Sequence, residues 1–482
     1  MSTPAASSAT PLNAVVDAPA ALSSRQRHRG LLWLVAAAFF MQALDSTIVN
    51  TAVPAMADAL KVTPLGMRTA LTSYVLTLAI LIPTSPWLCD RFGTRRIFGV
   101  AIAVFGLGSL LCGMAQTLPE LVAARVMQGV GGAALMPVGR YVLVRTIDRR
   151  DFVRAMSTVA TFGLLGSVLG PLLGGALVQY TSWRLIFLLN VPVAIALLWM
   201  NRRDMPDYRL DEAHPFDLVG FLLFAVTSAL LLIASEQASS DTRQWGLIAL
   251  FGVAAMVLGV LYVWHSKRTP YPVSDLSLLR VRSVWVALAG NLFTRLGVSG
   301  MFLLLVLFLQ VGCGWSPLMA GMMMVPQALG SISAKWVINR LLNWLGYRRL
   351  LFSNTLIVAV LLASFALFGR TTPMWLIASL VFAYGSFMGL QYTAMNTLIY
   401  VDLDVKHASM ASSMASTAQY LSMSFGIALA TLLMEWLLHG RAHTDYVLAF
   451  RWTVLLLALF TAAASGVFAR LRPAAASTKA NA

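Results

Sequence analysis

The sequence predicts an all-α membrane protein with about fourteen transmembrane helices, and two observations carry this prediction. The 482 residues are 59% hydrophobic and only 11% charged, whereas a soluble globular chain is about 25% charged. The hydrophobic residues also fall into runs of roughly 18–25, separated by short polar loops, and about 20 apolar residues cross a bilayer as a helix. Because backbone polar groups in lipid must pair within their own segment, these runs are expected to be helical.

The fourteen expected spans have boundaries defined to within about 2–4 residues. They follow one another closely from residue 31 to residue 469, with one longer polar stretch after residue 201. In chain order they are 31–56, 69–89, 97–116, 119–144, 155–179, 184–201, 217–235, 246–265, 284–310, 318–339, 350–368, 374–398, 408–438 and 447–469.

The net charge of +16 is distributed unevenly between the loops. Of the 35 basic residues, about 24 lie in one set of alternate loops and about 6 in the other set, which is the pattern of positive loops facing the cytoplasm. This pattern places both termini in the cytoplasm, which requires an even number of spans. It also accounts for the basic composition without a nucleic-acid partner.

The sequence contains no phosphate-binding loop and no hydrolase or kinase signature, so an enzyme is not expected. Its three cysteines, Cys89, Cys112 and Cys313, have neither disulfide nor zinc spacing. We therefore expect no metal and no cofactor. The first 30 residues are polar and rich in alanine and serine, and we expect them to form a disordered cytoplasmic tail rather than a cleaved signal.

A weak internal repeat divides the chain. The loops 88–96 and 341–349 share a leucine, a glycine and two arginines at one constant offset, and each loop follows the second helix of a six-helix set. Repeated halves of the same orientation are a transporter architecture, with the binding site between them. The expected units are a tail 1–30, a six-helix bundle 31–201, a linker with two extra helices 202–283, a second six-helix bundle 284–471, and a tail 472–482.

Four motifs resemble those of the major facilitator superfamily. Leu44 to Pro54 resembles a first-helix signature, Asp90 to Arg96 a cytoplasmic loop motif, Arg125 to Ala133 a proton-relay motif, and Gly163 to Gly175 the antiporter motif. The loop motif departs from the family at Pro86, where glycine is usual. Together the motifs resemble the fourteen-spanning drug:proton antiporters (EmrB/QacA type), most closely their HsrA/MdtD branch.

The resemblance covers nearly the whole chain beyond the first 30 residues. It implies a major facilitator fold, with two pseudo-symmetric six-helix bundles and two inserted helices. It also implies a multi-pass protein of the bacterial inner (cytoplasmic) membrane.

Asp45 is the deepest carboxylate in the chain. A charge at the bilayer centre costs at least about 2.5–3.5 kcal/mol, so it is retained only where it is paired, protonated or functional. Burial disfavours the charged carboxylate and a nearby cation favours it, so an acid between the two effects can bind and release protons. The resemblance implies this proton-coupling role for Asp45, with Arg125 of the fourth span as its partner. The alternative is a permanent ion pair that only locks two helices together.

The loop after the second span is a candidate cytoplasmic gate. The resemblance implies that Asp90 holds this side closed through its charge and a helix N-terminus, and Arg140 at the inner end of the fourth span is its candidate partner. For the arginines, orientation of the chain in the membrane is an equal alternative. The expected gate residues are Asp90, Arg91, Gly93, Arg95, Arg96 and Arg140.

Glycines recur every four residues in the fifth span and share one helix face, which lets helix backbones approach closely. Pro171 removes a backbone donor and favours a bend. Tight packing is one role of this face, and the resemblance adds a second role in restraining leak. The expected antiporter motif comprises Gly163, Gly166, Gly170, Pro171, Gly174 and Gly175.

Arg295 lies in the middle of the ninth span and shares a face with Asn291 and Ser299. The offset of the repeated loops relates Arg295 to Gln42, one turn from Asp45, so helices from both halves are expected to face one cavity. The alternative is a structural arginine bonded to carbonyl groups. The expected lining of this substrate cavity is Gln42, Gln128, Asn291, Arg295, Gln391, Tyr392 and Asn396.

The predicted function is proton-coupled export of small molecules, in the manner of multidrug efflux, by alternating access. With Asp45 as the only deep acid against Arg125 and Arg295, the charges favour neutral, zwitterionic or anionic substrates over dications. A dedicated exporter of one metabolite or anionic chelate is the closest alternative, and a membrane sensor without flux is a remote one. The expected partners are the substrate, protons and the lipid bilayer, and a periplasmic adaptor or outer-membrane channel is left open.

Overall fold

The computed structural model describes residues 18–147, 149–209, 214–239, 244–403, 408–439 and 445–471. Within these ranges the chain is helical and contains no β-strand, as predicted. Three 3₁₀ turns and one π-helical turn connect or interrupt the helices, at Ile82–Thr84, Leu276–Arg280, Phe365–Leu367 and Phe308–Gly312 respectively. The α-helices are α1 (Ala18–Ala59), α2 (Arg68–Leu81), α3 (Ser85–Phe92), α4 (Thr94–Met114), α5 (Leu118–Thr146), α6 (Arg149–Tyr180), α7 (Arg184–Leu188), α8 (Asn190–Asp204), α9 (Leu218–Ser239), α10 (Trp245–Ser266), α11 (Arg282–Val298), α12 (Met301–Leu307), α13 (Pro317–Met322), α14 (Val325–Ser364), α15 (Met374–Leu398), α16 (Ala408–His439) and α17 (Tyr446–Ala469).

Thirteen helical segments of the described chain are long and apolar enough to cross a membrane. The longest of them, Pro317–Leu367, contains the non-helical residue Gly346 (φ 67°, ψ 167°) within α14. This segment therefore consists of two spans, the expected 318–339 and 350–368. Each of the fourteen expected spans thus coincides with a helical segment of the described chain, although several of these segments comprise more than one helix.

The two loops that the internal repeat relates make similar backbone turns. Gly93 between α3 and α4 has φ 90° and ψ 145°, and Gly346 occupies the equivalent position with a positive φ. A residue with a Cβ atom rarely adopts a positive φ, whereas glycine does so at little cost. The glycines of the repeat therefore serve a chain reversal between consecutive spans.

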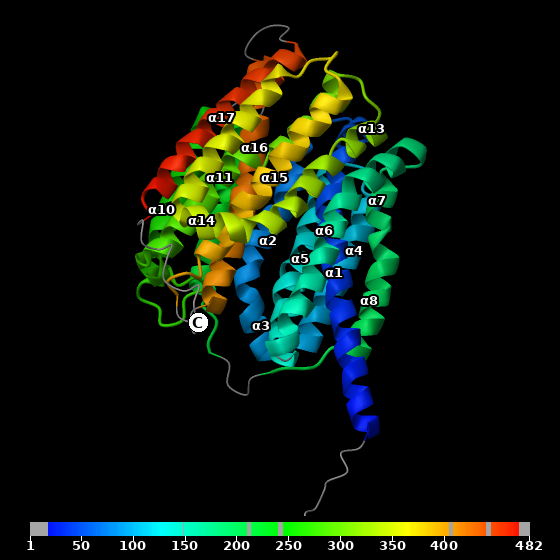
Figure 1. Cartoon of the computed structure of the whole chain (residues 1–482), viewed down its shortest axis with the longest axis vertical. Coiled ribbons are helices and arrows are strands. Elements are labelled where there is room, and N and C mark those ends of the chain that lie inside the picture. Colours follow the sequence, from blue (N-terminus) through cyan, green and yellow to red (C-terminus); the bar gives the residue numbers. More distant parts are fainter. Residues whose placement is uncertain are drawn as a thin grey trace, which may run out of the picture.

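The two ends of the helices define the sides of the molecule. The side that carries Gly93 is termed the inner side, because its basic loops predict the cytoplasm there, and the opposite side is termed the outer side. In Figure 1, α3 and the start of α1 lie at the bottom, on the inner side, and α7 and α13 lie at the top, on the outer side.

Three apolar clusters form the core of the part of the chain that the structure describes. One lies among α1 to α8, where α1 packs along α6 and α4 along α5, and includes Phe98 and Phe105. A second lies among α11 to α17 and includes Leu351 and Phe468. The third joins the two groups of helices on the outer side, from Val53 of α1 across to residues of α12 and α17. In this conformation the two groups are therefore sealed together on the outer side.

The helices α9 and α10 pack against each other at the edge of the molecule. Most of their apolar surface is exposed, including that of Leu222, Val226, Met256 and Val260, which suits a lipid environment. On the protein side α9 contacts both α2 and α16. The division of the chain into the bundles 31–201 and 284–471 with an inserted pair between them remains our proposal.

The N-terminal boundary differs from the expected one. Helix α1 begins at Ala18, so residues 18–30 are helical rather than part of a disordered tail. The part of α1 that qualifies as a membrane span is Arg29–Ala59, close to the expected 31–56. Residues 1–17 and the expected C-terminal tail 472–482 lie outside the described residues.

Candidate functional site

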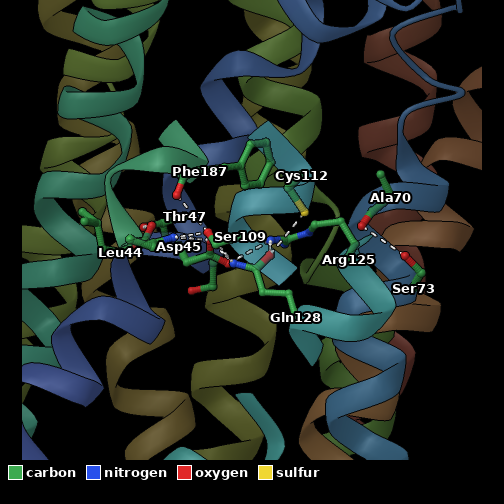
Figure 2. A network of polar contacts seen from close by, with 12 residues as sticks. Leu44, Asp45, Thr47, Ala70, Ser73, Ser109, Cys112, Arg125, Gln128 and Phe187 are labelled. Atoms are coloured by element: carbon green, nitrogen blue, oxygen red, sulfur yellow. Dashed lines mark hydrogen bonds and ion pairs between the residues drawn. The ribbon is translucent and has the colours of Figure 1, made fainter. Parts of the chain in front are cut away.

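Asp45 of α1 has no exposed surface, and its carboxyl group points into a network of polar side chains (Figure 2). Arg125 Nη1 donates to Asp45 Oδ2 at 2.8 Å, which forms the expected ion pair. Gln128 Nε2 and Asn190 Nδ2 donate to Oδ1 at 2.8 and 2.9 Å. Three donors thus converge on this carboxyl group, and both of its oxygens accept hydrogen bonds.

A second layer of hydrogen bonds orients the two amides. Ser109 Oγ of α4 accepts from Gln128 Nε2 at 3.2 Å and from Asn190 Nδ2 at 3.0 Å. The same hydroxyl donates to the carbonyl oxygen of Phe187 at 2.9 Å. Because Ser109 satisfies the remaining amide hydrogens, both amide groups are held with their donors toward Asp45.

The guanidinium group of Arg125 is fixed by more than its ion pair. Its Nη1 also donates to Gln128 Oε1 at 2.6 Å, and its central carbon lies 4.1 Å from the centre of the Tyr74 ring. A cation over an aromatic face is attracted by the ring quadrupole. These contacts hold Arg125 in one position beside Asp45. Removing one partner of such a buried ion pair costs about 3–5 kcal/mol of stability, because it leaves the other charge buried and unpaired.

Spacing and small residues explain how α5 reaches this position. Arg125 and Gln128 are three residues apart and therefore share a helix face. A Cβ atom on Gly131 would lie 2.6 Å from the carbonyl oxygen of Ala101, so glycine permits the close approach of α5 to α4. Gly108 of α4 meets the backbone of Gln128 in the same way, at 2.7 Å from its Cα atom.

Two cavities lie near this network, and neither is lined by Asp45 or Arg125. The inner cavity, of about 700 Å³, lies toward the inner side between α5 and α16. The central cavity, of about 310 Å³, lies between α1, α11 and α15. In this conformation the ion pair is therefore closed off from both. The inner cavity is lined by residues that include Gln42, Ser85, Arg140, Tyr141, Ser416 and Tyr420, and the central cavity by residues that include Ser46, Asn50, Arg295, Gln327, Tyr384 and Tyr392.

Arg295 is the charged residue of the central cavity. Its guanidinium carbon lies 3.8 Å from the centre of the Tyr392 ring, and its Nε donates to Asn291 Oδ1 at 2.5 Å. Among the residues that the structure describes, no carboxylate lies within ion-pair distance of it. A buried cation at 6% exposure thus faces a cavity in which the described residues supply no counter-charge.

Three of the seven expected substrate-cavity residues line a cavity. Arg295 and Tyr392 line the central cavity, whereas Gln42 lines the inner one. The expectation that Gln42 and Arg295 face one cavity is therefore wrong for this conformation. In this conformation the outer side is closed, and the space between the two groups of helices consists of the inner cavity and the central cavity, which have different lining residues.

The other four expected lining residues lie outside both cavities, and each has a different position. Gln128 belongs to the Asp45 network, and Asn291 supports Arg295 from the side. Gln391 is fully buried between Asn354 and Thr355, with hydrogen bonds of 2.7 and 2.8 Å. Asn396 is exposed on α15. Polarity alone therefore did not identify the face that each helix turns toward the cavities.

The expected gate is arranged differently from the prediction. Tyr141, rather than Arg140, contacts Asp90: its hydroxyl donates to Asp90 Oδ1 at 2.8 Å. No Asp90–Arg140 contact occurs in the described chain, and Arg140 instead lines the inner cavity. Asp90 and Arg140, the charges expected to close the gate, therefore do not pair in this conformation, in which the inner cavity is present.

The loop arginines also differ among themselves. Arg91 and Arg96 are exposed, as topology-setting residues would be. Arg95 donates from its Nε to the carbonyl oxygen of Met205 at 2.7 Å, and its backbone N–H donates to Asp207 Oδ1 at 3.1 Å. The Gly93 loop is thereby attached to the segment that follows α8.

The glycine face of α6 packs closely against α1. A Cβ atom on Gly166 would lie 2.6 Å from the carbonyl oxygen of Phe40, and Gly170 and Gly174 likewise leave no room beside Thr47 and Thr51. Gly163 lies outside this contact, because its Cβ atom would meet nothing closer than 3.9 Å.

The outer end of the same motif has another neighbour. A Cβ atom on Gly175 would lie 2.5 Å from the carbonyl oxygen of Pro317, at the start of α13, and the carbonyl group of Pro171 abuts Gly321. Here the motif forms part of the seal on the outer side.

Several functional candidates were not assigned from the sequence. Ser109 and Asn190 complete the Asp45 network, and the only signal for them is a polar residue within an otherwise apolar span. Asp45 is also not the only buried acid, since Glu435 of α16 is 7% exposed and pairs with Arg68. Partners that lie far apart in the sequence carry no periodic signal, so these contacts required the structure.

Comparison with known proteins gives consistent results. A family model described as Major Facilitator Superfamily matches residues 35–427. A protein of Serratia proteamaculans (strain 568) named "Putative multidrug resistance protein MdtD" is 41% identical over 447 residues, which cover 91% of this chain and 93% of that protein. The protein of the same name from Cronobacter sakazakii (strain ATCC BAA-894) is also 41% identical, covering 92% of this chain and 95% of its own length.

Solved structures share the fold at low sequence identity. The POT family transporter PepTSo superposes with a TM-score of 0.67 at 16% identity, over 92% of this chain and 97% of that one. A D-xylose-proton symporter gives a TM-score of 0.62 at 14% identity, over 90% and 96%. The fourteen spans, the buried Asp45–Arg125 pair and these matches lead to one conclusion: the chain is a multi-pass membrane transporter that belongs to the Major Facilitator Superfamily.

Proposed function

We propose that this transporter exports small molecules in exchange for protons, by alternating access, from the cytoplasm across the bacterial inner membrane, with both termini in the cytoplasm. The observation that carries the proposal is the buried Asp45–Arg125 pair. It is the place in the described structure where a mid-span carboxylate meets three hydrogen-bond donors and is closed off from both cavities. The name of the MdtD relatives supports multidrug-type efflux.

The proposed coupling follows from the change in charge at Asp45. The ionised carboxylate attracts Arg125 and accepts charge-assisted hydrogen bonds, which are about twice as strong as neutral ones. A proton on Asp45 removes the ion pair and converts one oxygen to a donor, so the contacts between α1, α5 and α8 weaken. Protonation and deprotonation thereby bias the transporter between its two conformations, which is the requirement for coupling.

The arrangement of the two sides supports alternating access. On the outer side the two groups of helices are joined by hydrogen bonds from Gln310 Nε2 to the Thr51 carbonyl oxygen at 3.0 Å and from Ser424 Oγ to the Thr72 carbonyl oxygen at 3.2 Å. On the inner side the inner cavity separates them. A rocking motion would open the first interface and close the second.

Substrate accumulation driven by a pH gradient tests the proposal. Purified protein would be reconstituted into vesicles and supplied with ethidium, chloramphenicol or carboxyfluorescein as cationic, neutral and anionic probes. We expect Asp45→Asn to reduce gradient-driven accumulation to the level of empty vesicles, because the amide cannot take up a proton. Asp58→Asn is the matched control, since Asp58 lies exposed at the outer end of the same helix and should behave as the wild type. Full gradient-driven accumulation in Asp45→Asn would contradict the proposal.

A second candidate, a dedicated exporter of an anionic metabolite or chelate, is favoured by Arg295. A cation in the central cavity without a protein counter-charge suits a substrate that supplies one. We expect Arg295→Gln to weaken transport of carboxyfluorescein more than that of chloramphenicol. Equal effects on both compounds would indicate a structural arginine instead.

A further inference from the structure

Arg68, at the outer end of α2, is a buried cation between two carboxylates. It is 4% exposed; its Nε contacts Glu236 Oε2 of α9 at 3.3 Å, and its Nη1 pairs with Glu435 Oε2 of α16. The adjacent hydroxyl of Thr69 donates to Glu236 Oε2 at 2.9 Å. One guanidinium group thus connects α2 with the inserted pair and with the C-terminal group of helices.

The inserted helix α9 is attached to this same span at its other end. Trp87 of α3, which lies in the continuous span Arg68–Phe92, donates from its Nε1 to the carbonyl oxygen of His214 at 2.8 Å. Its ring lies 4.7 Å, between centroids, from that of Phe216, just before α9. Contacts at the inner and the outer end therefore tie α9 to the span that carries Arg68.

The contact between α2 and α16 has a different character. The two helices touch on the outer side through Arg68 and Glu435, and through Ser424 and Thr72. On the inner side the inner cavity lies between this span and α16, with Ser85 in one wall and Ser416 in the other. In a rocking motion this is the interface that must open on the outer side, which takes Glu435 away from Arg68.

We propose that Glu236 of the inserted pair is a positioning residue of the transport cycle: its carboxylate stays paired with the guanidinium group of Arg68 when α16 moves away. A buried charge that loses its partner costs several kcal/mol, so an outward-open state without Glu236 would carry an unpaired arginine. With Glu236 in place and held by Thr69, Arg68 loses its pair with Glu435 but keeps its pair with Glu236, so its charge remains neutralised. The inserted helices then move with the span Arg68–Phe92, and the contact of α9 with α16 is the one that changes.

This inference rests on alternating access in the proposed function, but not on proton coupling. The test measures the distance between spin labels at Asp58→Cys and Leu448→Cys, both exposed on the outer side of the two groups of helices. The native cysteines are replaced by serine in all variants, and the distances are measured for every variant in lipid vesicles at the same two pH values, one high and one low. A long-distance population reports the outward-open state.

The two acids are expected to act in opposite directions. Glu435→Gln removes the pair that crosses the interface and should raise the long-distance population. Adding Glu236→Gln to that variant should lower the population again, by about ten- to a hundredfold, because the substitution removes a charge-assisted hydrogen bond to Arg68. Thr69→Val, which removes a bond to Glu236 without changing any charge, should act like Glu236→Gln but more weakly.

Each other outcome identifies a different error. If Glu236→Gln raises the long-distance population as Glu435→Gln does, the contact of α9 with Arg68 stabilises the closed outer side, and the inference is overturned. An unchanged population in Glu236→Gln also overturns it. If a long-distance population is absent from every variant and from the wild type at both high and low pH, alternating access itself fails.

Discussion

At the scale of single residues, Asp45 is held by donors from two other helices, Arg125 and Gln128 of α5 and Asn190 of α8. Both oxygens of the carboxyl group accept hydrogen bonds from these helices, so each donor fixes the position of α5 or α8 against α1. The neighbours of Asp45, and not only Arg125, therefore hold the arrangement from which the proposed proton exchange begins.

Asn190→Ala is expected to lower gradient-driven transport. The substitution removes one of the three donors to the Asp45 carboxyl group and the contact of α8 with α1 at this point. A lost hydrogen bond to a charged group is worth roughly 1.5–3 kcal/mol, which corresponds to about a ten- to a hundredfold change. The measurement is the initial rate of substrate accumulation under a fixed pH gradient in reconstituted vesicles.

Asn354→Ala is the matched control for this experiment. Asn354 is equally buried, at 2% exposure, but donates to Gln391 and Phe387 in the other group of helices. Its replacement should lower stability without lowering the rate of gradient-driven transport. Equal losses of transport in both variants would mean that general loosening of the protein, and not the donor to Asp45, causes the effect.

The pair at the centre of the site was predictable from the sequence, because a carboxylate and an arginine within apolar spans each require a partner. The assignment of Gln128 to the substrate cavity was wrong for a physical reason. Gln128 lies one turn from Arg125, so the helix face that places Arg125 against Asp45 places Gln128 there too. A polar residue beside a buried ion pair is more useful as a donor to that pair than as a cavity wall.

At the scale of helices, the contact between α1 and α6 depends on a row of glycines. The spacing of Gly166, Gly170 and Gly174 predicted a close approach, and the structure identifies α1 as the neighbour. The same motif contains Gly163, which lies outside the contact. The motif therefore offers a comparison between two glycines on one helix.

Gly166→Ala is expected to lower the stability of the protein by about 1–3 kcal/mol, the usual cost of overpacking. Its Cβ atom would lie 2.6 Å from a backbone oxygen of α1, which cannot rotate away as a side chain can. Gly163→Ala should leave stability unchanged, or raise it slightly through helix propensity. Thermal unfolding in detergent measures both, and equal losses in the two variants would contradict the packing argument.

For the inserted helices, the sequence predicts their extent but not their contacts with the rest of the protein. Helices α9 and α10 are almost uniformly apolar, so their extent was predictable but not the face that they turn toward the protein. The contacts that fix α9 are made by Glu236 near its outer end and by Phe216 just before its start. Such contacts at helix ends leave no periodic pattern.

At the scale of the whole molecule, the fold followed from the sequence, because hydrophobic runs and loop charges directly reflect the bilayer. The repeated glycine loops added the relation between consecutive spans. The conformation and its cavities did not follow, because they depend on which faces of distant helices meet. The separation of Gln42 and Arg295 into two cavities is an example, since both lie on the expected inward faces of their helices.

Proton movement at Asp45 is proposed to drive transport, and substrate-evoked proton flux is the measurement that reports on it. Purified protein would be placed in vesicles that contain a pH-sensitive dye, and substrate would be added under an imposed pH gradient. We expect proton flux that depends on substrate in the wild type and in Asp58→Asn, and no such flux in Asp45→Asn. Substrate-dependent proton flux that persists in Asp45→Asn, or substrate transport that ignores the gradient in the wild type, would contradict it.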